Sequence, residues 1–362
     1  MSEFPKLVVD LKKLENNVKQ IKKRCEACGI EIAGVIKGCS GIPECAKVYA
    51  ESGAKFIASS RLDQIEKITE FGVTTPKMLI RIPMKSEIKD AIRLTDISLN
   101  SEIEVLKELD KEAKLQNKKH KVILMVDLGD LREGFWKKEE LLEAALMVEN
   151  QLENLELAGI GTNLGCYGAI AATKDKLNEL VLDAEMIEAK IGRKLEYISG
   201  GATTSLPRIF DGDMPERVNL LRLGESVLLG KDLQDLWGYD MSFMNLDVFT
   251  IQAEIIEVKD KPTYPVGEIV VDAFGFTPEY EDRGIRKRAL IGLGKVDYAF
   301  TDMIYPRIKG VEILGASSDH TILDIEDAEA KLNVGDVLDF DVCYGSMVYV
   351  TNSPNVKIEI KK

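Results

Sequence analysis

The stretch LAGIGTNLGCYGAIAATKDKLNELVLDAEMIEAKI, residues 157–191, decides the fold class because it holds one complete strand-and-helix unit. The apolar run Leu157–Ile160 is typical of a buried strand, and Thr173–Ile191 has the spacing of an amphipathic helix. The apolar face of that helix is formed by Leu177, Leu180, Val181, Ala184, Ile187 and Ile191. A strand followed by such a helix is the building block of parallel α/β sheets.

The same unit recurs along the first two thirds of the chain. Apolar runs of this kind lie at Ile32–Ile36, Phe56–Ala58, Met78–Ile80, Ile97–Leu99, Val122–Val126, Leu157–Ile160, Tyr197–Ser199 and Val218–Leu223. Eight repeats over about 230 residues fit an α/β fold of the closed (β/α)8 TIM-type barrel better than an open doubly wound sheet. The open sheet stays as the alternative, because a sequence pattern does not show closure.

The pattern changes after about Trp237, where long helical segments stop. Short apolar runs separated by turns follow at Val248–Val258, Glu268–Val271, Leu290–Leu293, Ile313–Gly315, Val337–Asp341 and Val356–Ile360. They predict a C-terminal all-β domain. We therefore expect a barrel domain over residues 1–240 and a β-rich domain over residues 241–362, with the boundary between residues 235 and 246.

Composition narrows the class of protein. The chain has 362 residues and a net charge of −13, from 48 Lys and Arg against 61 Asp and Glu, which argues against nucleic-acid binding. No apolar run approaches the roughly 20 residues that span a bilayer, and the N-terminal residues lack a signal-peptide pattern. Six cysteines are too few for a disulfide framework, and two histidines argue against a zinc site. We expect a cytoplasmic protein with reduced thiols, no bound metal and no contact with a membrane.

The candidate active site lies where the barrel strands end, because barrel enzymes place their chemistry there. The first strand, Glu31-Ile-Ala-Gly-Val-Ile-Lys37, ends in a lysine. A lysine in this place is either a strand terminus whose head reaches solvent or the amine of Schiff-base chemistry. The strand alone leaves both interpretations open.

Two loops indicate a phosphate site beside Lys37. Ser199-Gly-Gly-Ala-Thr-Thr-Ser-Leu-Pro207 follows the seventh strand, and Arg222-Leu-Gly-Glu225 follows the eighth. Glycines such as Gly200 and Gly201 let backbone N–H groups approach a phosphate closely. Ordinary turn chemistry explains either loop taken alone. Together with Lys37 they point to pyridoxal 5'-phosphate, whose aldehyde needs an amine and whose phosphate needs such loops.

Fragments along nearly the whole chain carry a resemblance to a known family. They are Val8-Val-Asp-Leu11 with Asn16-Asn17, Gly34–Gly38, Val126–Gly134, Gly161–Gly165, Ser199–Gly201, Leu221–Ser226, Asp272–Gly275 and Leu314–His320. In this order and spacing they resemble the fold-type III pyridoxal-phosphate enzymes of the alanine racemase superfamily, most closely its ornithine racemase branch. The resemblance implies a barrel plus a β-domain in a head-to-tail homodimer, with each β-domain completing the partner's active site.

The resemblance assigns roles to three cationic residues. Lys37 matches the lysine that binds the cofactor covalently and moves the Cα proton on one face. Arg132 matches the arginine at the cofactor's phenolic oxygen and is also expected to bind substrate. Arg222 matches the arginine that faces the pyridine nitrogen. Because arginine does not give up its proton, the pyridine nitrogen stays unprotonated and the cofactor is a weaker electron sink. A weaker sink favours prompt reprotonation at Cα, which suits a racemase.

The remaining site residues also follow from the resemblance. The expected cofactor ligands besides Lys37, Arg132 and Arg222 are Asn163, Gly200, Gly201, Thr203, Gly224, Glu225 and Tyr344. Ser318 and Asp319 fall on the loop that meets the substrate carboxylate from the partner subunit.

Some positions depart from the alanine racemase pattern. In Gly294-Lys-Val-Asp-Tyr298, Lys295 stands where that pattern has a tyrosine base, so Lys295, Asp297 and Tyr298 are all candidates for the second catalytic base. Gly41 replaces a phosphate-binding tyrosine, Asn163 a histidine, and Met125 a lysine that is often carbamylated. These differences argue against a plain alanine racemase while leaving the cofactor chemistry intact.

The function expected from these residues is a pyridoxal-phosphate-dependent racemase that interconverts L- and D-amino acids, with ornithine as the expected substrate. The alternatives are a racemase for alanine, lysine or serine, a decarboxylase or lyase on the same scaffold, and a non-catalytic protein of pyridoxal-phosphate homeostasis. The β-rich second domain weighs against the last. A basic substrate needs an acidic group near its distal amine, and the sequence pattern does not single one out.

Overall fold

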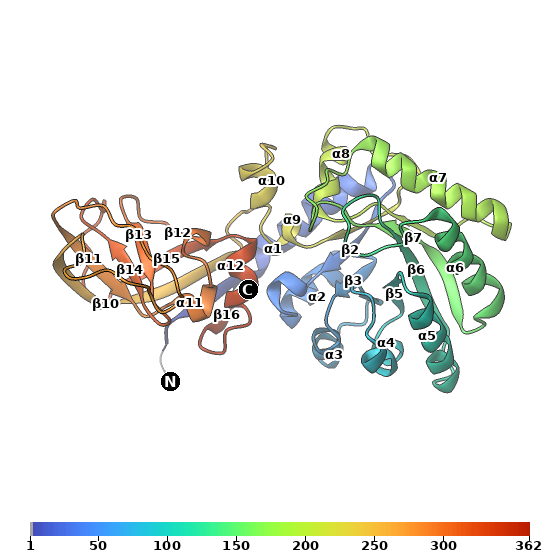
Figure 1. Cartoon of the computed structure of the whole chain (residues 1–362), viewed down its shortest axis with the longest axis horizontal. Helices are drawn as coiled ribbons and strands as arrows, with labels where there is room; N and C mark the ends of the chain where they lie inside the picture. The colour runs from blue at the N-terminus through green and yellow to red at the C-terminus, as the bar shows by residue number, and fades with distance from the viewer. Residues whose placement is uncertain (1–2) are drawn as a thin grey trace. The chain divides into compact units, whose positions relative to one another are not determined.

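The computed structural model describes residues 3–362, which divide into two units (Figure 1). One unit is formed by Leu14–Asn245. The other combines the N-terminal segment through Lys13 with Leu246–Lys362.

Eight parallel strands close into a barrel in the first unit. In order around the barrel they are β2 (Glu31–Val35), β3 (Phe56–Ser59), β4 (Lys77–Leu79), β5 (Ile97–Asn100), β6 (His120–Val126), β7 (Leu155–Thr162), β8 (Tyr197–Ser199) and β9 (Leu220–Leu223). The barrel closes where β9 pairs with β2, with Ala33 opposite Arg222. Each predicted apolar run overlaps one of these strands, so the closed barrel is confirmed and the open sheet is wrong.

The helices that follow the strands lie outside the ring of strands (Figure 1). The helices of this chain up to residue 235 are α1 (Leu11–Glu26), α2 (Pro43–Glu51), α3 (Leu62–Glu70), α4 (Ile88–Leu94), α5 (Ile103–Leu115), α6 (Lys138–Gln151), α7 (Lys174–Ile191), α8 (Leu206–Phe210), α9 (Glu225–Leu228) and α10 (Lys231–Asp235), with short 3-10 turns η1 (Lys37–Cys39), η2 (Lys85–Glu87) and η3 (Thr203–Ser205). Both ends of helix α7 are set by residues typical of helix caps. The Thr173 hydroxyl accepts a hydrogen bond from the Lys176 backbone at the start, and Gly192, with φ of 73°, follows the last turn. Across residues 3–362, none of the helices combines the length and the apolar composition that crossing a membrane requires.

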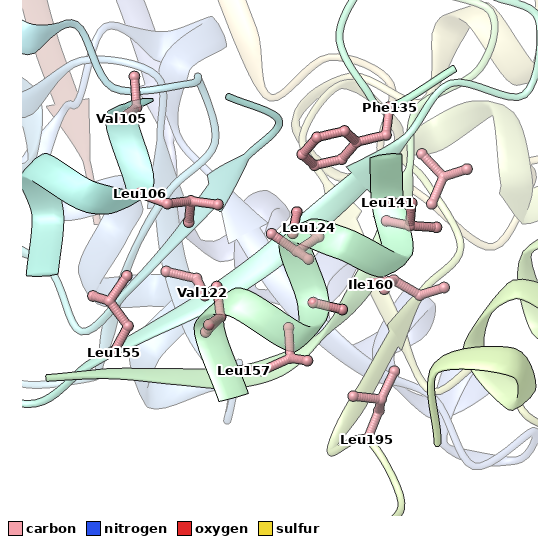
Figure 2. Close-up of a cluster of buried hydrophobic side chains, with 14 of the residues drawn as sticks. Val105, Leu106, Val122, Leu124, Phe135, Leu141, Leu155, Leu157, Ile160 and Leu195 are labelled. Atoms are coloured by element: carbon pink, nitrogen blue, oxygen red, sulfur yellow. The ribbon is translucent and has the colours of Figure 1, made fainter. Parts of the chain in front are cut away.

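Two apolar layers hold the barrel together. Along β6, Ile123 and Met125 pack inside the barrel, while Val122 and Leu124 pack between the strands and the helices. Figure 2 shows this outer layer, where side chains of β6 and β7 meet those of α5 and α6. Successive side chains of a strand point to opposite faces, and both faces of each barrel strand are buried here. Each strand is therefore a continuous run of apolar residues in the sequence. The packed barrel therefore fixes the positions of the polar residues at the carboxyl ends of its strands.

The second unit is built around an antiparallel sheet. Its elements are β1 (Lys6–Asp10), β10 (Phe249–Pro262), β11 (Ile285–Ile291), β12 (Ile304–Pro306), β13 (Glu312–Ala316), β14 (Thr321–Asp324), β15 (Val337–Val342) and β16 (Lys357–Lys361), with α11 (Lys295–Tyr298), η4 (Thr301–Met303) and α12 (Tyr344–Val350). The strand order is β12-β15-β10-β11-β14-β13, and β1 pairs with β10 and with β16. The long β10 pairs with β1 and β15 through its first half and with β11 through its second.

The structure corrects two sequence-based expectations in this unit. Lys6–Asp10 pairs with β10 and β16, so this N-terminal strand lies in the β-rich unit, although the expected barrel domain began at residue 1. Glu268–Val271 is not a strand: Val270 and Val271 are exposed and the segment pairs with no described strand. Its β-branched residues resemble a strand, but Gly267 before it (φ of 134°) and the turn at Asp272 after it leave it without a neighbour to pair with.

A buried asparagine secures the end of the barrel unit. The fully buried Asn17 of α1 donates from Nδ2 to the carbonyl oxygens of Val227 (3.1 Å) and Asn245 (2.8 Å), and its Oδ1 accepts from the Asn245 backbone (2.8 Å). One side chain therefore ties the first helix to α9 and to the last residue of the unit.

Replacement of this residue tests its contribution to stability. Asn17→Ala leaves buried carbonyl groups without donors, so we expect a loss of about 3 kcal/mol in the free energy of unfolding. Denaturant unfolding of the variant measures it. Asn16→Ala, at the half-buried neighbouring position, is the matched control and is expected to change stability by less than about 1 kcal/mol. Equal effects of the two changes would contradict this role.

Candidate active site

Polar side chains gather at the carboxyl ends of the barrel strands. Lys37 begins η1 just after β2, Arg132 lies on the loop after β6, Asn163 follows β7, and Arg222 lies in β9. Lys37 and Asn163 are half-buried, and Arg222 is only 4% exposed. The barrel therefore brings together residues that are up to 185 positions apart in the chain, between Lys37 and Arg222.

Arg222 is the fixed point of this site. Its Nη1 donates to the hydroxyl of Ser199 on β8, and its Nη2 donates to the carbonyl of Thr162 on β7 at 2.8 Å. Burial lowers the pKa of the guanidinium to about 10, so the group still carries its charge at neutral pH. The buried cation thus links three neighbouring strands and holds a permanent positive charge at their carboxyl ends.

Lys37 is the nucleophile candidate. Burial lowers the pKa of its amine, and the charges of Arg132 and Arg222 lower it further, while Cys166 and Glu133 act in the opposite direction. A lysine with a lowered pKa has a larger fraction of neutral amine, which is the form that attacks a carbonyl. The environment of Lys37 is therefore suited to Schiff-base chemistry.

The loop that carries Arg132 is held in place by two aspartates. Asp127 Oδ1 accepts hydrogen bonds from the backbone N–H groups of Gly129 (2.9 Å) and Leu131 (3.1 Å). The Asp130 carboxylate accepts from the backbone of Gly165 (2.9 Å) and Tyr167 (3.1 Å), which tethers the loop after β6 to the loop after β7. Burial opposes ionisation of Asp130, but these hydrogen bonds keep its pKa below the ordinary value.

Arg132 itself pairs with its neighbour. Its Nη2 donates to Glu133 Oε1 at 2.7 Å, and its Nε contacts Oε2 of the same carboxylate. The Glu133 side chain is 20% exposed and the Arg132 side chain is 41% exposed. The guanidinium thus has an anionic partner that orients it on the loop.

The two loops expected to hold phosphate are joined by a threonine. Thr203 Oγ1 accepts from the Ser226 backbone N–H and donates to its hydroxyl, both at 3.1 Å. Gly201 has φ of 115°, a conformation that favours glycine. A Cβ on Gly200 would lie 2.5 Å from Val218, so that glycine is required by packing. Thr203 therefore brings the loop after β8 against the start of α9, with Gly224 and Glu225.

The unsatisfied groups of the barrel unit fit a bound polar cofactor. The Nδ2 of Asn163 is buried and has no hydrogen-bond partner among the described residues. Asn163 directly follows Thr162, whose carbonyl accepts from Arg222. An unpaired buried donor costs free energy unless a ligand or water satisfies it. A reactive amine, two guanidinium cations and an unpaired donor are together suited to an anionic carbonyl compound such as pyridoxal phosphate.

In the β-rich unit, Lys295 is the candidate base whose head reaches the surface. Its ammonium lies 4.1 Å from the centre of the Phe274 ring and 4.0 Å from the Asp272 carboxylate, and the side chain is 22% exposed. Asp272 also accepts hydrogen bonds from the backbone N–H groups of Phe274 and Phe276, both at 2.9 Å. A turn thus positions an aromatic face and a carboxylate next to the Lys295 head.

Asp297 and Tyr298 are buried in the interior of the same unit. The Asp297 carboxylate accepts from the Gly294 backbone (3.2 Å) and from the Ser353 hydroxyl (2.7 Å). The Tyr298 hydroxyl is hydrogen-bonded to Thr321 Oγ1 at 2.7 Å, and burial raises its pKa to about 12. Both groups are engaged in holding the unit together.

The predicted substrate loop lies against the helix of Lys295. The backbone N–H of Lys295 donates to Ser317 O (2.9 Å), and that of Val296 donates to Ser318 O (3.1 Å). A Cβ on Gly294 would lie 2.1 Å from the Ser318 carbonyl oxygen, so this approach requires glycine. Ser318 and the exposed Asp319 therefore lie close to Lys295, while Tyr344 begins α12, which packs against α11.

Sequence reasoning missed Glu133, Cys166 and Ser226. Glu133 pairs with Arg132, and Cys166 acts on the pKa of Lys37 from the loop after β7. Ser226 is the partner of Thr203. An acidic residue directly beside Arg132 was the available signal for Glu133, whereas a sequence pattern carries no signal for the other two.

A barrel of this kind, with a lysine after its first strand and a buried arginine in its last, together with a β-rich unit, defines a known class of protein. Residues 9–231 match the family model described as "Alanine racemase, N-terminal domain". The chain belongs to the alanine racemase family.

Two relatives match over almost the whole chain. The chain is 41% identical over 357 residues to the ornithine racemase of Acetoanaerobium sticklandii, covering 99% of both sequences. It is 37% identical over 354 residues to the lysine racemase of Thermotoga maritima, covering 98% of both. The prediction of an amino-acid racemase of this superfamily is confirmed.

Solved structures share the fold at lower identity. The alanine racemase of Clostridium difficile 630 superposes with a TM-score of 0.73 at 19% identity, over 99% of this chain and 96% of that one. The D-threonine aldolase of Filomicrobium marinum superposes with a TM-score of 0.74 at 16% identity, over 97% and 89%. The same fold therefore occurs in a racemase and in an aldolase, so the fold alone does not define the reaction.

Glu225 provides a pH-dependent test of the loop after β9. Burial, helped by the nearby Asp232 carboxylate, raises the pKa of Glu225 from 4.5 to about 8, and its Oε2 has no hydrogen-bond partner among the described residues. Between these pH values the folded chain holds a proton that the unfolded chain has released. Stability therefore falls as the pH rises through this interval, by up to about 1.4 kcal/mol per pH unit.

Glu225→Gln removes this titration. We expect the free energy of unfolding of the variant, measured by urea denaturation, to increase relative to that of the wild type as the pH is raised from about 5 to about 8. The exposed Glu216→Gln is the control and is expected to follow the wild-type profile. Parallel profiles for Glu225→Gln and the wild type would contradict a raised pKa at Glu225.

Proposed function

We propose that this chain is a pyridoxal-phosphate-dependent racemase that interconverts L- and D-ornithine. The observation that carries the proposal is the 41% identity to an ornithine racemase over 99% of both chains. The barrel site supports it, because Lys37, Arg132 and Arg222 converge at the carboxyl ends of the strands. The small-molecule partner is an amino acid.

The cationic residues fit the cofactor by charge and by function. When bound, pyridoxal phosphate supplies an electron sink that acidifies the Cα–H bond of an attached amino acid. Lys37 holds the cofactor and moves the proton on one face of Cα, for which a lowered pKa prepares its amine. Arg222 keeps its proton at neutral pH and weakens the sink, so that the proton returns to Cα promptly.

The binding roles of the remaining barrel residues belong to the same proposal. Thr203, with the backbone of Gly200, Gly201, Gly224 and Glu225, holds the phosphate. Asn163, whose Nδ2 is unpaired within residues 3–362, donates to the cofactor. Arg132 binds the phenolic oxygen and the substrate carboxylate.

Lys295 is the proposed proton carrier for the opposite face of Cα. Its head is partly exposed, whereas Asp297 and Tyr298 are buried and hydrogen-bonded within their own unit. Ser318 and Asp319 lie beside it and are proposed to meet the substrate carboxylate; Tyr344 is proposed to reach the phosphate.

A head-to-tail homodimer is part of this proposal, because the partner's β-rich unit would bring Lys295 to the barrel site. Large apolar side chains are exposed on the loops after β6 and β7, namely Leu131 (63%), Trp136 (64%) and Tyr167 (72%). Val296 and Phe300, close to Lys295 in sequence, are also exposed. Exposed apolar patches mark surfaces that a partner covers.

The free thiols of all six cysteines support a reducing, cytoplasmic location.

Lysine is the second candidate substrate, since the chain is 37% identical to a lysine racemase over 98% of both sequences. A chiral assay of the purified protein with L-ornithine, L-lysine, L-alanine and L-serine distinguishes these substrates. Loss of optical activity at constant composition identifies racemisation, whereas release of carbon dioxide or an aldehyde would identify a decarboxylase or lyase and overturn the proposal.

Lys37→Ala tests the cofactor attachment. We expect the variant to lose the absorbance of covalently bound cofactor and to lose racemase activity by more than about 10⁴-fold. Lys47→Ala, at an exposed position of α2, is the control and is expected to retain both. Retention of activity and absorbance by Lys37→Ala would overturn the assignment.

Lys295→Ala tests the opposite-face base. Loss of one proton carrier is expected to slow racemisation by about 10²- to 10⁴-fold. Exchange of the Cα proton with heavy water, followed by NMR, is expected to persist for the enantiomer whose proton Lys37 removes and to be lost for the other. Tyr298→Phe, which removes a buried hydroxyl, is expected to keep exchange for both enantiomers. Unchanged exchange of both enantiomers in Lys295→Ala would exclude this base.

A further inference from the structure

A diamino acid brings a second ammonium group into the barrel site, where three cations already lie. Placing that ammonium in a partly buried site requires a carboxylate, because an unpaired charge is costly away from water. The question is which carboxylate at the carboxyl ends of the strands is able to receive it. The inference below rests on the proposed function.

At this end of the barrel, Glu225 is buried with a pKa raised to about 8, so it is mostly uncharged at neutral pH, and three further carboxylates are engaged by fixed groups. Asp127 and Asp130 accept hydrogen bonds from backbone N–H groups. Glu87, after β4, binds Arg81 through both oxygens at 2.8 Å and also accepts from the Met84 backbone at 3.1 Å. Releasing any of them would break the loop that they hold.

Glu133 differs in the kind of partner that it has. Within the described chain its carboxylate is bonded to the Arg132 guanidinium, which is a side chain on the same loop. Arg132 is itself proposed to bind the substrate's α-carboxylate. When Arg132 turns to the substrate, Glu133 is left with a charge to pair.

Glu133 also lies within electrostatic reach of the reactive groups. Its negative charge opposes the lowering of the pKa of Lys37 and of Arg222 that burial causes. Its side chain is 20% exposed, so its charge is partly shielded from solvent and an ion pair here is stronger than one on the open surface. Its position is therefore suited to a group of the bound substrate.

We propose that Glu133 is the specificity residue that binds the distal ammonium of the diamino-acid substrate. Substrate binding exchanges one ion pair, Arg132 with Glu133, for two, Arg132 with the α-carboxylate and Glu133 with the distal ammonium. A substrate with a neutral side chain engages Arg132 but leaves Glu133 half-buried and unpaired, which disfavours that substrate. The same carboxylate thus attracts diamino acids and disfavours neutral ones.

Glu133→Gln tests the proposal with L-ornithine and L-norvaline, which has the same chain length without the distal amine. The amide still accepts a hydrogen bond from Arg132, so the loop keeps its support. We expect kcat/KM for L-ornithine to fall by about 10- to 100-fold, mainly through KM, because a hydrogen bond to a charged group is lost. For L-norvaline we expect kcat/KM to stay within about threefold or to rise.

Glu87→Gln is the matched control, because Glu87 is likewise a carboxylate paired with an arginine after a barrel strand. It is expected to leave the preference between the two amino acids unchanged. A binding readout accompanies the kinetics: the change in absorbance of the bound cofactor, titrated with each amino acid, gives an apparent Kd, and Glu133→Gln is expected to weaken binding of L-ornithine alone.

Equal losses for both amino acids would show that Glu133 acts only through Arg132, and this outcome would overturn the proposal. Unchanged kinetics and binding for both would overturn it as well. If the wild-type protein racemised neither amino acid, the proposed function would fail, and the binding comparison would still decide whether Glu133 recognises the distal ammonium.

Discussion

The buried charge of Arg222 is the constraint on which the site depends. A guanidinium that is 4% exposed persists in a barrel only if its donors are satisfied, and here the acceptors come from β7 and β8 while the arginine lies in β9. The closing pair of strands, β9 with β2, then brings this charge near Lys37, where burial and the charges of Arg132 and Arg222 lower the pKa of the amine. The cation that ties the strands together thus adds to the lowering of the pKa of Lys37, and the mutual repulsion of Lys37, Arg132 and Arg222 is relieved by an anionic ligand.

The barrel was predictable because its strands are buried on both faces. Such strands read as continuous apolar runs, and the eight runs that the sequence offers correspond to β2 through β9. The β-rich unit was harder because its pairings join distant segments. Lys6–Asp10 finds its partners at Phe249–Gln252 and Lys357–Lys361, and no local pattern encodes a pairing over that separation. Glu268–Val271 has the composition of a strand but no partner, which shows that propensity alone does not make one.

The site was predictable only in part, for a related reason. Lys37 could be singled out because it stands at the end of a barrel strand beside loops suited to phosphate, whereas its role and that of Arg222 came from the family resemblance. The sequence could not decide which residue of the short helix is the second base, because burial differs between neighbouring residues. Lys295 is partly exposed, whereas Asp297 and Tyr298 are buried. For the pairing of Arg132 with Glu133 the sequence offers only the adjacency of the two residues, and adjacency does not fix whether two side chains meet.

Charge in this protein acts locally. The chain carries a net charge of −13, yet the site that we propose gathers Lys37, Arg132 and Arg222 around one carboxylate, Glu133. A cluster of this sign favours the phosphate and carboxylate groups of cofactor and substrate, but it repels any further ammonium. On this proposal, an amino acid with an uncharged side chain leaves the Glu133 charge unpaired, whereas the distal ammonium of a diamino acid pairs with it. The proposal for Glu133 thus assigns the choice of amino acid to one carboxylate, while the cofactor and the proton transfers stay the same.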